Sequence, residues 1–182
     1  MNNKKEENVV VLDFLANGYV NSRQKFNTPI VQAIGKQNFT LLELVPKKNV
    51  ILHLLETVYI GSDKRDKIHH INGKLDYEKL TSTAKSELEH AVLELVLEKE
   101  EEFVNFFNKA YPLNTRVHIL ELLPGVGKRH MLELVDKRKD KPFESFKDIK
   151  ERVKLMPDPE KTITNRIVLE LQGKEKHYLF VR

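Results

Sequence analysis

Short apolar runs separated by turn signals occupy the first 80 residues of the chain. The runs are rich in β-branched and other apolar side chains, and they span 9–15, 29–35, 39–45, 50–60 and 68–75. Only residues 36–38 separate the second run from the third, which predicts a β-hairpin. Strands that recur about every 10 residues, with turns between them, predict a small β-barrel or sandwich.

After residue 80 the apolar positions change to helical spacing. Thr81, Ser82 and Thr83 are candidate N-caps. The apolar stripe that follows is Leu80, Ala84, Leu88, Ala91, Val92 and Leu95. A second stripe is Phe103, Phe106, Phe107 and Ala110. We interpret these phenylalanines as packing in a core or between domains, rather than as a platform for stacking bases. The charged run between the stripes, 98–102, is interpreted as a solvated helix face.

The last third predicts short helices followed by a strand. Asn114 or Thr115 can cap a first short helix, and a second helix follows Gly127. A capping box over 145–148 and an Asp-Pro pair at 158–159 begin two more helices. Gly173 stands where a helix C′ residue is expected. The final apolar run, 177–181, predicts a strand that pairs with the N-terminal sheet.

The charge divides the chain in the same way. Residues 1–80 carry twelve basic and nine acidic side chains, residues 81–111 carry three and seven, and residues 112–182 carry sixteen and eleven. We therefore predict an α+β fold in three parts. These are a small β-barrel over 1–80, an acidic helical connector over 81–111, and an all-helical domain with a C-terminal strand over 112–182.

Composition removes several classes of protein. The 182 residues include no Cys, which excludes disulfides, thiolate nucleophiles, zinc ribbons and thiolate-held iron–sulfur clusters. The polar start, residues 1–7, does not look like a signal peptide, and no apolar run reaches the ~18 residues of a membrane span. We therefore expect a cytoplasmic protein with no membrane partner. The net charge of +4 is by itself only a weak sign of a polyanionic partner.

The most specific pattern lies in residues 122–128, which read Leu-Leu-Pro-Gly-Val-Gly-Lys. Gly125 and Gly127 are expected to permit positive φ and a close approach of the backbone to a ligand. Val126 is expected to point inward and hold the turn. The alternative is an ordinary tight connection between two helices.

Charge at this turn favours an anionic ligand. A helix begins directly after the glycines, and its free N–H groups and positive dipole end attract anions. Lys128 and Arg129 stand at the same place. The expected ligand is a nucleic-acid phosphate contacted through backbone amides, which carries little sequence information.

This turn resembles the helix-hairpin-helix motif of nucleic-acid-binding proteins. Residues 142–149, which read Pro-Phe-Glu-Ser-Phe-Lys-Asp-Ile, resemble the continuation found in tandem helix-hairpin-helix domains. That resemblance implies a second, pseudo-symmetric hairpin. Its turn, 155–159, lacks the Gly-x-Gly and contains Asp158. Only the first hairpin is therefore expected to contact phosphate, and the second is expected to be structural.

A second candidate binding region lies in the barrel. An aromatic residue is followed by basic ones, a combination that suits stacked single-stranded bases and their phosphates. These residues are Tyr59, Lys64, Arg65, Lys67 and Lys74, with His69 and His70 between them. A solvated basic loop with a half-buried Tyr59 explains the pattern equally well. The N-terminal half resembles an OB-fold, a small five-stranded barrel.

Nearly the whole chain is similar to an archaeal protein family, DUF655. The stretches that carry the resemblance are 59–61, 65–68, 73–75, 123–127 and 178–182. The resemblance implies an OB-like barrel joined to a helix-hairpin-helix domain, and nucleotide or RNA binding. It implies no catalytic residues.

Neither a catalytic nor a metal-binding arrangement is found in the sequence. None of the seven His residues has the spacing of a metal site, and the adjacent His69 and His70 are expected to point to opposite sides of a strand. No metal or cofactor is therefore expected. We predict a non-catalytic nucleic-acid-binding protein, with RNA favoured over DNA.

Two alternatives remain. One is a protein–protein assembly module in an RNA or DNA processing complex, which docks a partner through the acidic, Phe-rich segment 94–110. The weaker one is a nuclease or a DNA-repair accessory.

Overall fold

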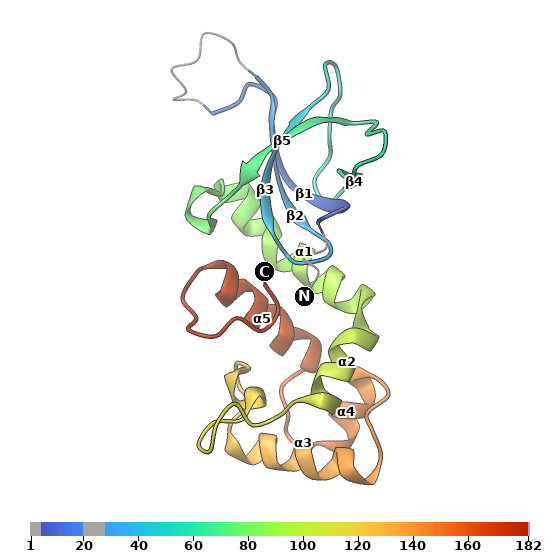
Figure 1. The fold of residues 1–182 in the computed structure, drawn as a ribbon, viewed down its shortest axis with the longest axis vertical. Helices are drawn as coiled ribbons and strands as arrows, with labels where there is room; N and C mark the ends of the chain where they lie inside the picture. The colour runs from blue at the N-terminus through green and yellow to red at the C-terminus, as the bar shows by residue number, and fades with distance from the viewer. Residues whose placement is uncertain (1–4, 20–27, 182) are drawn as a thin grey trace. The chain divides into compact units, whose positions relative to one another are not determined.

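The computed structural model describes residues 5–19 and 28–181 and shows an α+β fold (Figure 1). The strands are β1 (Asn8–Leu15), β2 (Ile30–Gly35), β3 (Leu41–Pro46), β4 (Thr57–Tyr59) and β5 (Ile68–Lys74). The α-helices are α1 (Ser82–Glu98), α2 (Glu100–Lys109), α3 (Lys128–Asp140), α4 (Phe146–Arg152) and α5 (Pro159–Leu171). Two 3₁₀ turns are η1 (Tyr77–Lys79) and η2 (Ile119–Leu122). None of the helices in these ranges is long and apolar enough to cross a membrane.

The strands form one antiparallel sheet that curls into a half-barrel. Their order is β4-β1-β2-β3-β5, so β4 returns to pair with β1 and the first four strands make a Greek key. Register shifts in β1 and in the β3–β5 pair bend the strands and help the sheet to curl. In this order β4 and β5 are the two edges of the sheet.

Alternation of side chains explains the core of the half-barrel. Alternate residues of β1, β2 and β3 point inward, where they meet side chains from the later strands and loops. The buried set is Val9, Val11, Val31, Ala33, Leu42, Leu44, Leu52, Val58, Ile60 and Ile68. The predicted hairpin over 29–45 is present as β2 and β3.

The apolar run 50–60 is not a single strand, contrary to the sequence prediction. Within this run only Thr57–Tyr59 forms a strand, which pairs with β1, while Leu55 and Glu56 make single backbone hydrogen bonds to Val11. Asn49 and Leu55 adopt positive φ angles of 63° and 62°, which interrupt an extended course. The first part of the run is therefore a turn, in which Leu52 is buried and Ile51 is exposed.

The start of α1 is attached to the opposite face of the sheet. Thr81 caps the helix, because its Oγ1 accepts the N–H of Ala84 at 3.0 Å. The same hydroxyl donates to Asp13 on β1, and the N–H of Thr81 donates to the buried Gln32 on β2 at 2.9 Å. All six residues of the predicted stripe from Leu80 to Leu95 are buried.

The chain divides into two compact units. The barrel unit comprises Met1–Val92 and Ile167–Arg182, and the helical unit comprises Leu93–Arg166. The connector expected over 81–111 therefore falls partly in each unit. In the helical unit Phe103, Phe107 and Ala110 are buried, so these residues of the second stripe are core, as predicted.

The C-terminal segment 177–181 is not a strand, contrary to the prediction. The backbone N–H groups of Leu179, Phe180 and Val181 instead donate to the carboxylate of Glu170 on α5, at 2.7–3.0 Å. A buried carboxylate thus provides the acceptors that a neighbouring strand was expected to provide. Gly173 has a φ of +68° just beyond α5, as a C′ glycine should.

The first short helix of the last third is a single 3₁₀ turn, η2. His118 caps it, rather than Asn114 or Thr115. Asn114 Oδ1 accepts the N–H groups of Arg116 and Val117 and so closes an earlier turn.

Candidate nucleic-acid interface

The glycine turn lies between η2 and α3 in the helical unit. Val126 is buried, as predicted, and its N–H donates to the carbonyl of Leu123 at 3.1 Å. This amide is therefore used within the turn, and Val126 contributes packing rather than a contact to a ligand. Gly125, Gly127, Lys128 and Arg129 are all exposed.

The two glycines have different roles. Gly125 has a φ of +79°, and a Cβ at this position would lie 3.0 Å from Cγ of Pro157. Gly127 has a φ of −84°, and a Cβ there would have no neighbour within 4 Å. The expectation of positive φ is thus right for Gly125 and wrong for Gly127. Gly127 leaves the approach to the α3 N-terminus open.

The first turn of α3 presents unsatisfied donors. The first helical hydrogen bond runs from Met131 to the carbonyl of Gly127, at 3.0 Å. The N–H groups of Lys128, Arg129 and His130 have no hydrogen-bond acceptor within the described parts of the chain. These donors coincide with the positive end of the helix and with two exposed cationic side chains, a combination that can bind a phosphate.

Two buried side chains, those of Arg166 and His118, stabilise this turn. The guanidinium of Arg166, only 2% exposed, donates to the carbonyl of Leu122 at 2.9 Å. His118 and Glu121 form a capping box around η2, in which Nδ1 of His118 accepts the N–H of Leu120 and Glu121 accepts the N–H of His118. Burial lowers the pKa of His118, and the charge of Arg138 lowers it further. The spacing of His118 and Glu121 is that of a capping box, a signal that the sequence analysis missed.

The turn between α4 and α5 follows a similar backbone course. Leu155 has a φ of +57°, and the residue after it, Met156, is buried like Val126. Pro157 lies against Gly125, so the two turns are side by side. The negative charge of Asp158 argued against phosphate contact at this turn. In the structure Asp158 forms ion pairs with Lys150 and Lys161, which compensate that charge.

In the barrel unit, two of the predicted binding residues are occupied by other contacts. The hydroxyl of Tyr59 accepts the N–H of Asp63 at 3.2 Å and lies 3.3 Å from the Asp63 carboxylate. Lys67 forms an ion pair with Glu56, and their hydrogen bond lowers the pKa of that carboxyl. The Tyr59 hydroxyl and the Lys67 ammonium are therefore engaged within the barrel unit, whereas Lys64 is exposed.

Arg65 and Lys74 do come together, around a cleft of about 780 Å³. The cleft lies among the segment after β4, the edge strand β5, the β2–β3 turn and the segment before β1. Lys5 adds a third cation, which no signal in the sequence pointed to. Apolar and amide groups also line it: Leu42, Ile60, Ile71, Gln37 and Asn38. Glu6 and Glu7 line it as well, and the carboxylate of Glu6 accepts backbone N–H groups of the β2–β3 turn. Three cations against two carboxylates, above an apolar floor, suit a base with its phosphates.

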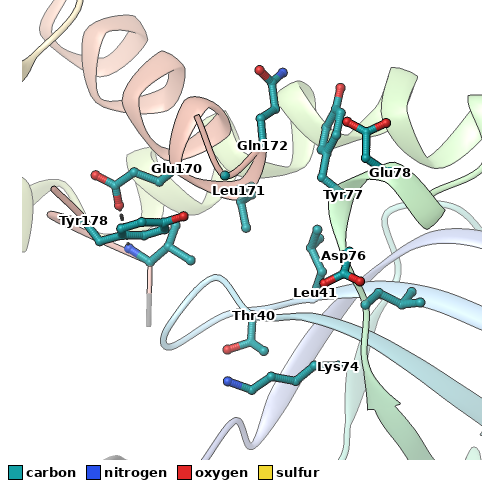
Figure 2. A pocket seen from close by; sticks show the side chains of 13 residues that line it. Thr40, Leu41, Lys74, Asp76, Tyr77, Glu78, Glu170, Leu171, Gln172 and Tyr178 are labelled. Atoms are coloured by element: carbon teal, nitrogen blue, oxygen red, sulfur yellow. Dashed lines mark hydrogen bonds between the residues drawn. The ribbon is translucent and has the colours of Figure 1, made fainter. Parts of the chain in front are cut away.

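A smaller hollow of about 300 Å³ lies beside the C-terminal segment (Figure 2). Lys74 lines it together with Asp76, Glu78, Tyr77 and Tyr178. Asp76, Glu78 and Glu170 line this hollow against Lys74, whereas the larger cleft has three cations against Glu6 and Glu7. The larger cleft is therefore the better candidate for a nucleic acid.

His69 and His70 lie close to each other, contrary to the sequence prediction. Their Nδ1 atoms are 2.7 Å apart, at a place where the register between β3 and β5 shifts. Over the described residues, no three His, Asp or Glu side chains gather in a way that could hold a metal ion.

Residues 5–182 match the model of a family described as "Protein of unknown function (DUF655)". The chain is similar to the uncharacterized protein MJ0038 of Methanocaldococcus jannaschii, with 48% identity over 174 residues that cover 94% of this chain and 78% of the relative. It is also similar to the crystal structure of Af1531 from Archaeoglobus fulgidus, a DUF655 protein, with a TM-score of 0.91 and 40% identity. That match covers 97% of this chain and 100% of the other. The relatives are archaeal, and the match supports the α+β fold.

Proposed function

We propose that this chain, which belongs to the DUF655 family, is a non-catalytic nucleic-acid-binding protein. The α3 N-terminus grips a phosphate, and the barrel cleft holds a single strand. RNA is the favoured ligand, because the resemblance that extends over nearly the full chain implies nucleotide or RNA binding.

The arrangement at the α3 N-terminus carries this proposal. Three backbone donors without acceptors, two exposed cations and an open approach at Gly127 coincide there. Phosphate contacts of this kind position a nucleic acid without reading its sequence.

The topology supports the same function. Two adjacent turns, each with a left-handed residue followed by a buried apolar one, are consistent with a pair of helix-hairpin-helix elements. A five-stranded Greek-key sheet whose edges β4 and β5 stay apart is consistent with a partly open OB barrel, a fold that binds oligonucleotides.

The alternative, protein docking through segment 94–110, has less support. Phe103 and Phe107 are buried and Phe106 is half-buried. The phenylalanines that would anchor a partner therefore pack within the helical unit instead.

Gly127→Val tests the proposal most directly. A valine here has room, but its side chain covers the α3 N-terminus. We expect the affinity for a structured RNA to fall about 10- to 100-fold, since hydrogen bonds to charged groups contribute about 1.5–3 kcal/mol. Lys128→Ala should cost about 1 kcal/mol and reduce the salt slope by about one. Anisotropy titrations measure both.

Gly73→Val is the matched control, because that glycine also has an open Cβ position and lies in the barrel unit. It should leave the affinity for the structured RNA unchanged. If the Gly127→Val protein is folded by circular dichroism and binds as tightly as the parent, the α3 N-terminus is not the phosphate site.

A further inference from the structure

Leu155, at the tip of the α4–α5 turn, has an unfavourable combination of properties. Its φ is +57°, in the left-handed region that leucine rarely adopts, and its side chain is 84% exposed. Backbone strain at a residue other than glycine persists where the surroundings impose it, and it concentrates at functional sites. Exposing a leucine adds no stabilisation to the fold.

The neighbouring turn shows what folding alone requires at this position. Val153 and Met156 are buried in the second turn, as Leu123 and Val126 are in the first. The left-handed position between them is Gly125 in the first turn and Leu155 in the second. Glycine or asparagine would form the turn with less strain, so the leucine needs another explanation.

Contacts on several sides hold the α4–α5 turn in place, so Leu155 has a fixed position on the surface. The N–H of Lys154 donates to Glu133 on α3 at 3.0 Å. Asp158 is paired with Lys150 and Lys161, and Pro157 contacts the first turn at Gly125. Leu155 is therefore held next to the glycine turn that binds phosphate in the proposed function.

We propose that Leu155 is an apolar wedge that contacts the bases of a double-stranded region while the α3 N-terminus holds its backbone. This inference rests on the proposed function. Proteins that bind the minor groove of DNA frequently insert an apolar side chain between base steps and partly unstack them. The wide, shallow minor groove of double-stranded RNA also exposes base edges to such a side chain. The exposed Lys154 beside the leucine favours a polyanion over an apolar protein surface, because such a surface would have to desolvate the ammonium group.

Leu155→Asn separates binding from stability. Asparagine tolerates the left-handed conformation, so we expect the melting temperature to stay the same or to rise by a few degrees. The affinity for an RNA hairpin should fall about tenfold. Leu155→Met keeps an apolar side chain and should retain most of the affinity.

Leu55→Asn is the matched control, because Leu55 also has a positive φ, of 62°, and lies in the barrel unit. It should leave binding of the hairpin unchanged.

A fluorescent base reports the wedge directly. The probes are RNA hairpins with 2-aminopurine at successive positions in the stem. With the parent protein, fluorescence should rise at one step as that base unstacks, and the rise should be absent with Leu155→Asn.

The outcomes separate this inference from the proposed function. A parent that binds none of the hairpins overturns both. A parent that binds, with equal affinity for Leu155→Asn or with no fluorescence rise at any step, overturns the wedge alone. Loss of a protein partner on Leu155→Asn, with RNA binding intact, assigns Leu155 to protein docking and also overturns the wedge.

Discussion

At the scale of single residues, His118 makes the stability of the candidate phosphate-binding turn depend on pH. Its Nδ1 accepts the N–H of Leu120 at 3.2 Å, which a doubly protonated imidazole cannot do. Burial and the nearby Arg138 lower the pKa of His118 below its usual value of about 6.5. The neutral form is therefore part of the folded structure.

A pH-dependent loss of stability follows from this. Because the folded pKa lies below the unfolded one, the stabilisation is fully present above about pH 6.5 and is lost as the pH falls through the folded pKa. His118→Asn keeps a capping acceptor that does not titrate. Urea unfolding at pH 7.5 and 5.5 should show a smaller loss of stability for His118→Asn than for the parent. His90→Gln, at an exposed position on α1, should behave like the parent. Equal losses for the parent and for His118→Asn would contradict this account.

Local sequence signals predicted side-chain positions well where neighbours in the chain determine them. Val126 is buried, and Gly125 is left-handed, as its turn requires. The predictions for Tyr59 and Lys67 depended on contacts that composition does not reveal. Lys67, for example, is paired with Glu56, eleven residues earlier in the chain. Lys5 joins the cleft only because the fold brings it there.

At the scale of elements, arginines cap the C-terminal ends of helices. Arg138 donates to the carbonyls of Phe107 and Ala110 at the end of α2, at 2.7 and 2.6 Å. Arg152 donates to those of Lys137 and Lys141 at the end of α3. These guanidinium groups donate to carbonyls that helices leave free, so those donors are not available for direct contacts to a phosphate, although the positive charge remains. The number of basic residues in the last third therefore overstates the number of cations that can contact a phosphate directly.

The C-terminal segment depends on one carboxylate in the same way. Glu170 is 1% exposed and accepts three backbone N–H groups from 179–181. Glu170→Gln replaces one acceptor oxygen with a donor, and we expect a loss of about 1–3 kcal/mol in the free energy of unfolding. Urea titration measures the loss, and hydrogen exchange at 179–181 should accelerate. Glu151→Gln disrupts only an exposed pair with Lys147 at 3.8 Å and should cost less than about 1 kcal/mol. Unchanged exchange at 179–181 would show that the carboxylate does not hold this segment.

The spacing of apolar residues predicted the positions of helices and strands better than it predicted which segments pair with one another. The β2–β3 hairpin, the buried stripe of α1 and the helices after residues 127, 145 and 158 were predicted from spacing and caps. The run 177–181 has the composition of a strand, but Glu170 satisfies its amides. Residues 50–56 are mostly apolar, but left-handed backbone at Asn49, just before them, and at Leu55 prevents a strand. Both errors arise from backbone geometry and long-range contacts, which composition does not encode.

At the scale of the whole molecule, each compact unit carries one candidate site. The barrel unit has the cleft with Lys5, Arg65 and Lys74, and the helical unit has the α3 N-terminus with Lys128 and Arg129. The domain boundaries expected at 80 and 111 were placed where composition changes. The compact units divide within α1 and within α5 instead, because the chain after residue 166 returns to the barrel unit.

Two weak sites on one chain should bind a ligand that spans both more tightly than either alone, because the second contact is intramolecular. We therefore expect an RNA hairpin with a single-stranded extension to bind more tightly than the hairpin without it. Lys5→Ala/Lys74→Ala should remove this advantage and reduce the salt slope for the extended RNA by about 1.4, at about 0.7 for each single-strand phosphate contact. The affinity for the hairpin alone should not change.

The reciprocal pair makes this prediction specific to the two units. Lys128→Ala/Arg129→Ala should weaken binding of both RNAs, because the proposed phosphate site at the α3 N-terminus would contact the double-stranded part of each. Lys139→Ala/Lys147→Ala removes two exposed lysines outside both sites and should change neither affinity beyond the small effect of net charge. Anisotropy titrations over a range of salt concentrations measure all three variants. If Lys5→Ala/Lys74→Ala weakens binding of both RNAs equally, the barrel cleft does not hold the single strand, and its cations act only through the overall field of the molecule.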